Sequence, residues 1–510
     1  MGTFRGAWSL AGLAAGGAGL ATSYVVASVL AVRDSPVVAV AELVIRVTPG
    51  AVVEQAIASL GAADKPLLVG GIFVFLALVF AWAGRLAARI WWLAVLLLGA
   101  LAGVGVVAVA IQETPSAVSY LPIAVGFVTW VLVLSLLTDR LRAAERPATD
   151  ERVPTEGRRG FLIGAGAVVV ISLGLGGLGR FFGRGRREVE ESRRLLRLTG
   201  VTEPRVPPGT KIGLAGVSPW ATPVEDFYLI HTAIALPTIE PEEWRLRIHG
   251  LVDREITLTY QDLLARERTE AWVTLNCVSN PVGGDLIGNA WWSGVSLPDL
   301  LDEAGVSDEA DALLQTSEDG WTCGTPLSVV RDGREAMLAV AMDGRPLPIE
   351  HGFPVRTLVP GLYGFVSATK WVVDIEVTRF GRFEAYWTGK GWAEQAPVRL
   401  ASRIDVPRSG AEVAAGDVRV GGVAWQQHVG IEAVEVAVDG GEWQAVDLAE
   451  APTDDTWVQW AGTVSVDPGD HTLRVRATSR DGEVQTSVER DVVPDGATGW
   501  HDVEFTASDA

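Results

Sequence analysis

Five apolar runs in the first 180 residues constrain the fold of this chain more than any other feature. They carry no charged residue and lie at 8–32, 66–84, 90–111, 118–138 and 160–179. Each is long enough to cross about 30 Å of hydrocarbon as a helix, since a spanning helix needs about 20 residues. A cleaved signal peptide is a poor alternative for the first run, because four more runs follow it. We therefore predict that residues 1–180 form an all-α transmembrane bundle of about five helices that anchors the chain in the lipid bilayer.

Basic residues predict how this bundle is oriented. Arg5, the loop with Arg85 and Arg89, and the arginine-rich loop 139–159 are expected in the cytoplasm, because cytoplasmic loops are enriched in Lys and Arg. An odd number of crossings then places the remainder of the chain on the extracytoplasmic side of the cytoplasmic membrane. Seven arginines beyond the fifth run oppose this orientation, so the charge rule alone is ambiguous there. They are Arg180, Arg184, Arg186, Arg187, Arg193, Arg194 and Arg197.

A paired arginine opens the fifth run. Arg158-Arg159-Gly160-Phe161-Leu162 resembles a twin-arginine export signal, here placed inside the chain instead of at its beginning. That pathway exports domains that have already folded around a cofactor. Two arginines before a membrane helix also occur simply as positive-inside residues, so this motif by itself leaves both interpretations open.

Charge divides the chain into two unlike halves. Residues 1–200 contain 19 Lys and Arg against 13 Asp and Glu, a net charge of +6, whereas residues 201–510 contain 23 against 49, a net charge of −26. A surface this acidic repels nucleic acid and anionic lipid. We therefore expect no nucleic-acid partner for the second half.

The pattern after residue 180 predicts three further parts. Residues 181–225 combine a charged helical stretch with a Pro- and Gly-rich segment and are expected to be a linker. Residues 226–398 alternate short β-like and helical runs, which indicates a mixed α+β domain. Residues 399–510 show short alternating strands separated by turn signals, which predicts an immunoglobulin-like β-sandwich followed by a C-terminal tail. Such a module usually serves packing or dimerisation, so a homodimer through it is expected.

Two cysteines limit the metal chemistry available to the chain. Cys277 ends a β-like run and precedes the glycine-rich stretch 283–292, and Cys323 is the other thiol. Two cysteines are too few for a Cys-rich zinc or iron–sulfur site, although they could be linked by a disulfide. On spacing alone, Cys277 is either a metal ligand or a buried packing residue. Cys323 is expected to be a small buried residue.

Several motifs in a fixed order resemble the sulfite-oxidase family of molybdopterin enzymes. The resemblance covers about residues 220–505, including the β-sandwich, which is similar to that family's dimerisation domain. It implies a mixed α+β molybdopterin domain followed by the sandwich. The motifs are Cys277 with Asn280 and Gly288-Asn289-Ala290-x-Trp292, then Pro346-Leu347-Pro348-x-x-His351-Gly352-Phe353-Pro354-Val355-Arg356, then Val359-Pro360-Gly361-x-x-Gly364, and then Lys370-Trp371.

The resemblance also implies roles for individual residues. It makes Cys277 the catalytic residue and the molybdenum ligand, which suits the soft, sulfur-rich centre that a pterin dithiolene provides. It places His351 and Arg356 against the cofactor, and a planar guanidinium suits the pterin phosphate. Further donors are expected downstream, and two residues of the first cofactor-contacting segment are expected to contribute. These residues are Ser367, Thr369, Lys370, Tyr228 and His231.

Departures from the family pattern bear on the substrate. Sulfite oxidases have arginines beside the cysteine motif and in the first segment, whereas residues 277–282 and 227–231 of this chain are apolar or neutral. A sulfite dianion would lack its clamp. The stretch 389–392 also stands where that family places a tyrosine near the metal. The motifs Phe227-Tyr228-x-x-x-Thr232 and Tyr363-Gly364-Phe365 look more like the bacterial periplasmic methionine-sulfoxide reductase branch, which implies a neutral sulfoxide, N-oxide or related substrate.

The membrane half offers no recognised electron carrier. All six histidines lie after residue 230, and no Cys-x-x-Cys-His or iron–sulfur spacing occurs, so neither haem nor an iron–sulfur cluster is expected. Electrons must then come from a separate partner. We predict a membrane-anchored molybdopterin (Moco) oxidoreductase that transfers oxygen atoms to or from a small molecule. Sulfite oxidation is the alternative within enzymes, and a non-catalytic membrane-anchored adaptor that retains the fold is the alternative of another class.

Overall fold

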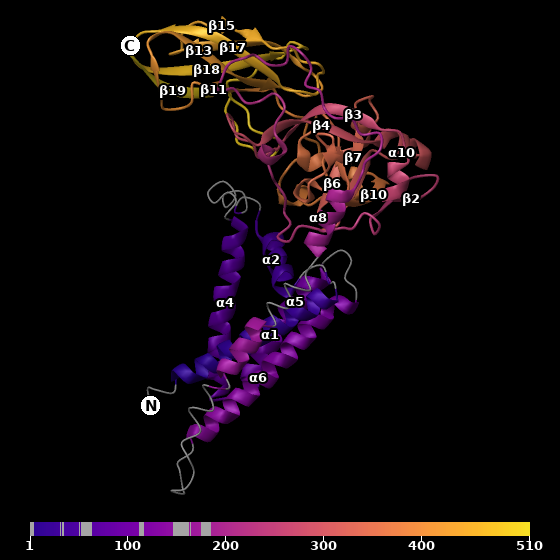
Figure 1. Cartoon of the computed structure of the whole chain (residues 1–510), viewed down its shortest axis with the longest axis vertical. Helices are drawn as coiled ribbons and strands as arrows, with labels where there is room; N and C mark the ends of the chain where they lie inside the picture. The colour runs from indigo at the N-terminus through magenta and orange to yellow at the C-terminus, as the bar shows by residue number, and fades with distance from the viewer. Residues whose placement is uncertain are drawn as a thin grey trace. The chain divides into compact units, whose positions relative to one another are not determined.

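The structure is a computed structural model, and it divides the chain into two compact units. One unit contains Met1–Glu188 with Ala233–Leu236, and the other contains Val189–Thr232 with Pro237–Ala510. Figure 1 shows the chain coloured from its N-terminus to its C-terminus. The structure describes residues 5–30, 32, 35–49, 52, 64–111, 117–145, 163, 165–174 and 185–509.

The described part of the first unit is helical. Four of its helical segments are long and apolar enough to span a membrane, at Gly6–Val29, Lys65–Ala87, Trp91–Ala110 and Ala117–Ala143. These four confirm the apolar helices predicted over the first four runs. The helices and turns of this unit are α1 (Arg5–Val29), α2 (Pro36–Val47), α4 (Asp64–Ala87), α5 (Trp91–Ala110), η2 (Ala117–Tyr120) and α6 (Leu121–Glu145).

The fifth predicted run is described only in part. Ala165–Gly174 form a short apolar helix, and the ends of the run lie outside the described residues. Arg158-Arg159, the pair that resembles an export signal, also lies outside them. A fifth crossing and the export signal therefore stay predictions.

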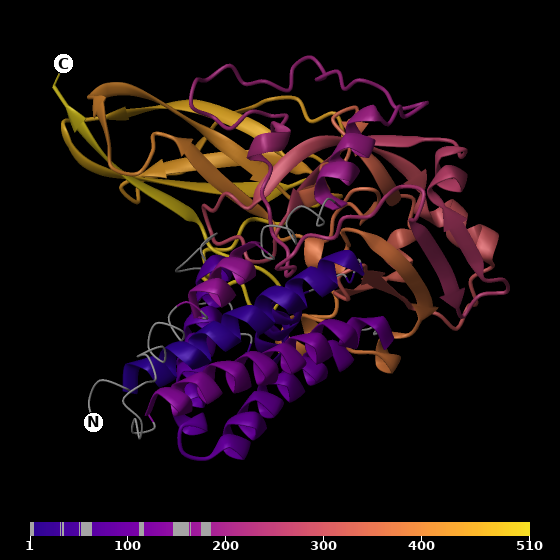
Figure 2. The same ribbon diagram turned by 60° about the horizontal axis from the view of Figure 1, so that its bottom comes forward.

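Small residues allow α1 to approach its neighbours closely. A Cβ atom on Gly12 would lie 2.0 Å from the carbonyl oxygen of Phe80 in α4, and one on Gly19 would lie 2.0 Å from the ring of Trp130 in α6. The indole of Trp130 donates a hydrogen bond to Gly16 O (3.1 Å). Close backbone approach at glycine is how apolar helices gain van der Waals contact without a hydrophobic driving force. Helices α1 and α6 accordingly run side by side in both views (Figures 1 and 2).

The second unit begins with α8 and continues through an irregular segment. Helix α8 (Gly185–Leu195) starts at the end of the first unit, and its Glu190 pairs with Arg193 (2.8 Å) and Arg194 (2.8 Å). Residues 196–223 then contain no helix or strand. Its Trp220 is nevertheless buried in the apolar core of this unit, so the linker role of 181–225 stays a prediction.

The central region, residues 226–398, contains two β-sheets. One has the order β2-β1-β10-β5-β6, and the other has the order β3-β4-β7-β8 with β9 paired to β7. The elements around it are η3 (Val224–Asp226), β1 (Arg245–Gly250), β2 (Ile256–Thr259), α9 (Tyr260–Leu264), β3 (Thr269–Asn276), β4 (Ile287–Ser296), α10 (Leu297–Ala304), β5 (Ala312–Ser317), β6 (Thr322–Pro326), α11 (Leu327–Val330), β7 (Met337–Met342), β8 (Arg345–Pro346), η4 (Ile349–His351), β9 (Arg356–Leu358), η5 (Gly364–Val366), β10 (Val372–Thr378), η6 (Phe380–Arg382) and η7 (Thr388–Lys390).

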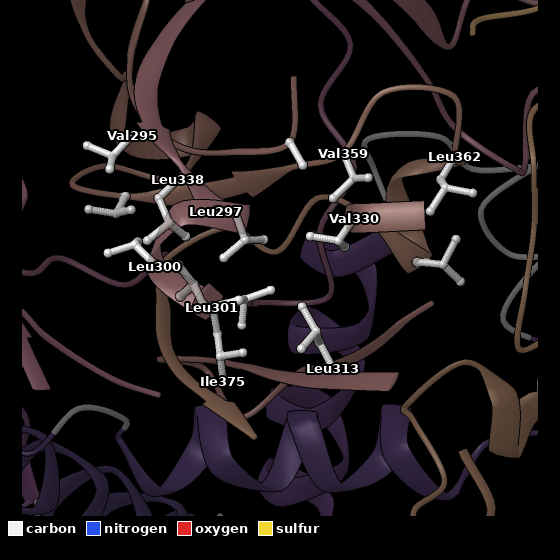
Figure 3. Packing of buried hydrophobic residues seen from close by; sticks show 14 of the residues in the cluster. Val295, Leu297, Leu300, Leu301, Leu313, Val330, Leu338, Val359, Leu362 and Ile375 are labelled. Carbon is white, nitrogen blue, oxygen red and sulfur yellow. The ribbon is translucent and has the colours of Figure 1, made fainter. Parts of the chain in front are cut away.

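Helix α10 links the two sheets of the central region through its apolar face. Ser296 caps its first turn by accepting from Asp299 N (3.2 Å), and Gly305 ends it in the left-handed conformation. Its leucines Leu297, Leu300 and Leu301 are fully buried and pack with strand residues of both sheets (Figure 3). Each such leucine contributes about 1.5–3 kcal/mol on burial.

The C-terminal region, residues 399–510, is composed of two further sheets around a separate apolar core. Their strand orders are β11-β13-β17-β16 and β12-β19-β18-β14-β15. The last strand, β19, pairs with both β18 and β12 and so belongs to the second of these sheets. The immunoglobulin-like topology stays a prediction. The strands are β11 (Ala401–Val406), β12 (Ala411–Ala414), β13 (Gly416–Trp425), β14 (Ile431–Val438), β15 (Gln444–Ala445), β16 (Asp447–Leu448), β17 (Val458–Val466), β18 (Gly469–Ser479) and β19 (His501–Ser508).

Candidate functional site

Cys277 follows directly after the last residue of β3, in a short connection to β4. Its backbone N–H donates to Leu286 O (2.9 Å), and its carbonyl accepts from Asn280 N (3.1 Å). The side chain of Asn280 closes the loop by accepting from Leu286 N (2.9 Å). The glycine-rich stretch 283–292 is therefore a loop only as far as Leu286, since Ile287 begins β4. This hairpin fixes the thiol at a sheet edge.

Both thiols of the chain are buried and free. Burial raises the pKa of Cys277, and the nearby Lys370 ammonium opposes that shift. Burial raises the pKa of Cys323, on β6, to about 11. The disulfide that the sequence left open is not formed.

The first segment brings aromatic rings to the same place. Phe227 is buried, stacks on Tyr228 with 5.3 Å between ring centroids, and contacts the rings of Trp292 (5.8 Å) and His351 (5.7 Å) edge-on. Burial raises the pKa of Tyr228 above its usual range, while Cys277 raises it further and Arg356 lowers it. The phenol is therefore within electrostatic reach of both residues.

A tight turn brings together the backbones that carry the expected basic residues. Gly352 has φ of +109°, and a Cβ atom there would lie 3.1 Å from Cβ of Arg356 and 3.1 Å from Cα of Lys370. Only glycine adopts that conformation readily and leaves this space. The turn follows η4, which ends at His351. His351, Arg356 and Lys370 therefore converge because this position has no side chain.

Arg356 is buried without a carboxylate partner among the described residues. Its Nη1 donates to His351 O (3.2 Å), and its guanidinium lies 5.1 Å from the ring centroid of Trp292. Burial lowers the pKa of Arg356 to about 10. A buried cation of this kind needs an anion, because desolvation is costly without compensation.

His351 experiences the same cationic surroundings. Burial lowers the pKa of His351, and together with the charges of Lys370, Arg356 and His231 it brings that pKa to about 3. The imidazole is therefore neutral at ordinary pH. The ring of His231 in turn contacts Trp371 edge-on, with 6.2 Å between centroids. Two histidines, an arginine and a lysine thus gather near Cys277.

The loop before β10 contributes two hydroxyl residues with different surroundings. Ser367 donates to Leu362 O (3.2 Å) and Tyr363 O (3.0 Å), so its proton is used within the loop. Thr369 is held by its backbone N–H, which donates to Thr357 Oγ1 (2.8 Å), and its own hydroxyl has no partner. Lys370 Nζ donates to Glu350 O (2.8 Å).

The unpartnered atoms of this region indicate which group would fit here. Leaving a buried donor or acceptor unpaired costs about 1–3 kcal/mol, so such atoms are rare without a ligand. A polar group that offers an anionic acceptor to the guanidinium and N–H or O–H donors to the oxygen and ring nitrogen atoms would satisfy this set. Buried side-chain atoms without a hydrogen-bond partner near Cys277 include Asn276 Oδ1, His351 Nδ1, Arg356 Nε and Thr369 Oγ1.

Gly364 lies next to two residues of the site. A Cβ atom on Gly364 would be in ordinary van der Waals contact with Tyr228 Oη at 3.7 Å and Asn276 O at 3.8 Å. Within the described part of the chain, no group of three or more His, Cys, Asp or Glu could hold a metal ion.

Comparison with known proteins adds independent evidence. Residues 233–387 match the model of the oxidoreductase molybdopterin binding domain. An uncharacterized oxidoreductase of Bacillus subtilis, YuiH, is 34% identical over 166 residues, which are 32% of this chain and 80% of that protein. The chain belongs to the sulfite-oxidase-like family of molybdopterin oxidoreductases. It is thus a molybdenum-cofactor-dependent oxidoreductase.

Other members of the family extend the similarity. Sulfite oxidase of Gallus gallus is 30% identical over 298 residues, which are 49% of this chain and 64% of that protein. Sulfite oxidase of Homo sapiens is 29% identical, and this chain spans 47% of its length. The chain therefore spans about half to two thirds of the sulfite oxidases that it matches.

A solved structure supports the fold. The sulfane dehydrogenase SoxCD from Paracoccus pantotrophus aligns with a TM-score of 0.51 at 23% identity, and the alignment covers 61% of this chain and 91% of that one. The likeness confirms a sulfite-oxidase-type molybdopterin fold with a β-rich C-terminal region.

Several residues of the site escaped sequence reasoning. Phe227 stands in a motif to which no role was assigned, and the structure places its ring against His351. Asn276 was not considered, and its Oδ1 is buried without a hydrogen-bond partner. Gln315 and Thr357 were not considered, and both are fully buried. Thr357 Oγ1 donates to Gln315 Oε1 (2.5 Å) and accepts from Thr369 N (2.8 Å). The sequence signal that could have indicated Thr357 was its position directly after Arg356. The other four histidines all have polar partners of their own, namely His249, His428, His471 and His501.

Proposed function

We propose that Cys277 is the molybdenum ligand of this enzyme and that the buried donors around it hold the pterin cofactor. The observation that carries the proposal is the buried Arg356 guanidinium, which has no carboxylate among the described residues and lies within electrostatic reach of Tyr228 beside Cys277. A guanidinium recognises a phosphate in a planar, bidentate manner.

The other site residues would contribute separate contacts to the cofactor. His351 and Thr369 each offer one unpartnered polar atom, and Lys370 adds a positive charge. Tyr228 and His231 would form the wall on the side of the first segment. Ser367 would act indirectly, by holding the loop before β10 through its hydrogen bonds to Leu362 O and Tyr363 O. When bound, molybdenum supplies the two-electron change of oxidation state that oxygen-atom transfer requires.

The two cysteines allow a matched test of this assignment. Cys277→Ser should abolish turnover and the Mo(V) signal of the purified protein, because serine replaces the thiolate ligand. Cys323→Ser, the control, exchanges a buried thiol on β6 and should leave the molybdenum content unchanged. A Cys277→Ser protein with wild-type molybdenum, signal and turnover would exclude the assignment.

Arg356 provides a second test. Arg356→Met should reduce cofactor retention by about 30-fold or more, since truncating one partner of a buried charge pair costs about 2–5 kcal/mol. Molybdenum and pterin are measured separately after gel filtration. A wild-type chain that contains neither molybdenum nor pterin after expression in a cofactor-competent host would instead favour the non-catalytic adaptor.

For the substrate, we propose a small neutral sulfoxide, N-oxide or related molecule. No Lys or Arg occurs in 277–290 or in 227–237, and the side chains that reach solvent there include Leu229, Ile230 and Val282. A dianion would find no clamp in these segments. Assays with reduced dye and sulfoxides or N-oxides should show turnover.

Sulfite oxidation is the second candidate, favoured by the identity with sulfite oxidase of Gallus gallus. It predicts turnover of sulfite with an electron acceptor and no reduction of sulfoxides. Either activity requires an electron-transfer partner, because all six histidines lie after residue 230 and the apolar helices contain no haem-binding pair. We propose that this partner is a separate protein.

We also propose that residues 1–180 anchor the catalytic part outside the cytoplasm, with residues 181–225 as linker, and that the C-terminal region supports a homodimer. The four long apolar helices support the anchor. A reporter that is active only outside the cytoplasm, fused after residue 200, should be active. Replacing Arg158-Arg159 with lysines should abolish export. Sedimentation in detergent measures the oligomeric state.

A further inference from the structure

The strand that leads to Cys277 is hydrogen-bonded to the C-terminal region through one residue. Thr274 N donates to Asp455 O (2.9 Å), and Thr274 O accepts from Gln427 Nε2 (3.1 Å). Its hydroxyl accepts from Trp457 N (2.9 Å). Every polar group of Thr274 is therefore bonded to a residue more than 150 positions later in the chain, three residues before the thiol.

This contact covers the outer edge of a sheet. β3 is the terminal strand of the order β3-β4-β7-β8, so its outer backbone groups have no neighbouring strand. The hydroxyl of Thr274 also donates to Asn289 Oδ1 (3.1 Å) on β4, and Asn289 Nδ2 donates to Trp220 O (3.0 Å). The C-terminal region thus bonds β3 directly, and the hydroxyl of Thr274 continues this contact to β4.

The loop after Cys277 is held from the other side by Arg403 of β11. Its Nη1 donates to Gly284 O (2.7 Å), and its Nη2 donates to Ser218 Oγ (2.8 Å). Its Nε donates to Asp405 Oδ1 (2.7 Å) in an ion pair whose side chains are only 9% and 10% exposed. The guanidinium is oriented by a buried carboxylate and so presents a fixed donor to the loop.

The same loop has no room to shift outward. A Cβ atom on Gly283 would lie 2.2 Å from the ring of His501, and Gly283 has φ of +76°. The ring is itself fixed, because His501 Nδ1 accepts from Ile404 N (3.0 Å). The loop after Cys277 therefore fits against β19 and β11.

We propose that the C-terminal region positions Cys277, with Thr274 and Arg403 as positioning residues that hold the two segments flanking it. This inference rests on the proposed function, in which Cys277 is the metal ligand. A single protein ligand has no neighbour to correct its direction, so the backbone on both sides must fix its sulfur. Groups that orient a ligand usually change metal affinity or activity by about 10–100-fold.

The first test uses the full-length chain expressed without cofactor, so that it does not depend on activity. Thr274→Val keeps the shape of the side chain but removes the bonds to Trp457 N and Asn289 Oδ1. Amide hydrogen exchange of residues 275–286 should then accelerate by about ten-fold, because the hairpin opens more easily. Thr274→Ser restores the hydroxyl and should return exchange to the wild-type rate.

The control is Thr210→Val. Thr210 is fully buried, and its hydroxyl donates only to Pro207 O (2.9 Å), away from the hairpin. It should leave exchange at residues 275–286 unchanged. Gln427→Leu is a second variant, in case Thr274→Val does not fold. It removes only the donor to Thr274 O and should accelerate the same exchange from within the C-terminal region.

The second test uses the loaded enzyme. Thr274→Val and Gln427→Leu should change the Mo(V) spectrum and lower kcat by about ten-fold at unchanged molybdenum content. Wild-type exchange, spectrum and kcat in both variants would overturn the proposal, as would a lowered melting temperature with a wild-type spectrum and kcat. If Cys277→Ser retains molybdenum and its signal, the proposed function fails. The exchange measurement uses the cofactor-free chain, so it tests the positioning of residues 275–286 independently of that outcome.

Discussion

Buried arginines have different surroundings in the central and C-terminal regions. Arg403 in the C-terminal region is 8% exposed and is paired with Asp405, whereas Arg356 in the central region is 4% exposed and has no carboxylate among the described residues. The C-terminal arginines Arg474, Arg476 and Arg480 also have acidic partners. These four C-terminal arginines therefore all have a carboxylate partner. The central region instead contains a buried positive charge that would fit a bound anion, and we base the proposed cofactor site on this difference.

The largest expected effect is on stability. Arg403→Met leaves Asp405 buried without its partner and should lower the free energy of unfolding by about 3–5 kcal/mol. Arg356→Met removes an uncompensated buried charge and should leave the stability of the cofactor-free chain unchanged or raise it. Thermal unfolding of the full-length chain in detergent measures both.

A large loss of stability in cofactor-free Arg356→Met would break this comparison. It would mean that the guanidinium is already compensated within the protein, so that Arg356 need not face an anionic group. Equal losses in both variants would remove the distinction between the two regions.

A pH titration is expected to show the next largest effect. The pKa of His351 is about 3 in the folded chain and about 6.5 when unfolded. Between these values the unfolded state binds a proton that the folded state does not, so stability falls as pH drops below about 6.5. His351→Gln removes this contribution. The melting temperature of the cofactor-free variant should therefore fall less than that of the wild type between pH 7 and pH 5; an identical pH dependence would show that His351 is not buried in this way.

Two buried threonines should separate structural from cofactor-directed hydroxyls. Thr357→Val leaves Gln315 Oε1 and Thr369 N without partners and should cost about 1–3 kcal/mol of stability. Thr369→Val removes a hydroxyl without a partner, so the cofactor-free chain should keep its melting temperature. Cofactor retention in Thr369→Val should fall about five-fold, equivalent to one hydrogen bond of about 1 kcal/mol. Unchanged retention would remove Thr369 from the site.

The smallest expected effect lies in the C-terminal region. A hydrogen bond from His471 to Asp439 (2.7 Å) raises the pKa of His471. Its stabilisation is present below pH 6.5 and is lost as pH rises through the folded pKa, opposite in sign to His351. His471→Gln should weaken the decline of the free energy of unfolding between pH 6 and pH 9. The change should be less than about 1 kcal/mol, because the pair lies at the surface. An unchanged decline would show that the pair contributes nothing.

A sequence pattern indicates a strand most clearly where one face of the strand is less buried than the other. β14 (Ile431–Val438) is such a strand, and its pattern is typical of one. In β4 nearly every side chain is buried, and its Gly288 and Gly294 resemble turn residues, so its pattern does not distinguish a strand from a loop. A strand buried on both faces has no alternation that a sequence pattern could detect.

The sequence by itself determined the apolar helices, the family and the order of motifs around Cys277, because these depend on composition and on residues close together in the chain. Tertiary structure alone decided which of the expected donors remain unpartnered and that Thr274 is bonded to Asp455, Gln427 and Trp457. Hydrogen bonds between residues more than 150 positions apart depend on how sheets pack and on strand register. No local pattern records that packing, so the support of Cys277 by the C-terminal region could only be found in the folded chain.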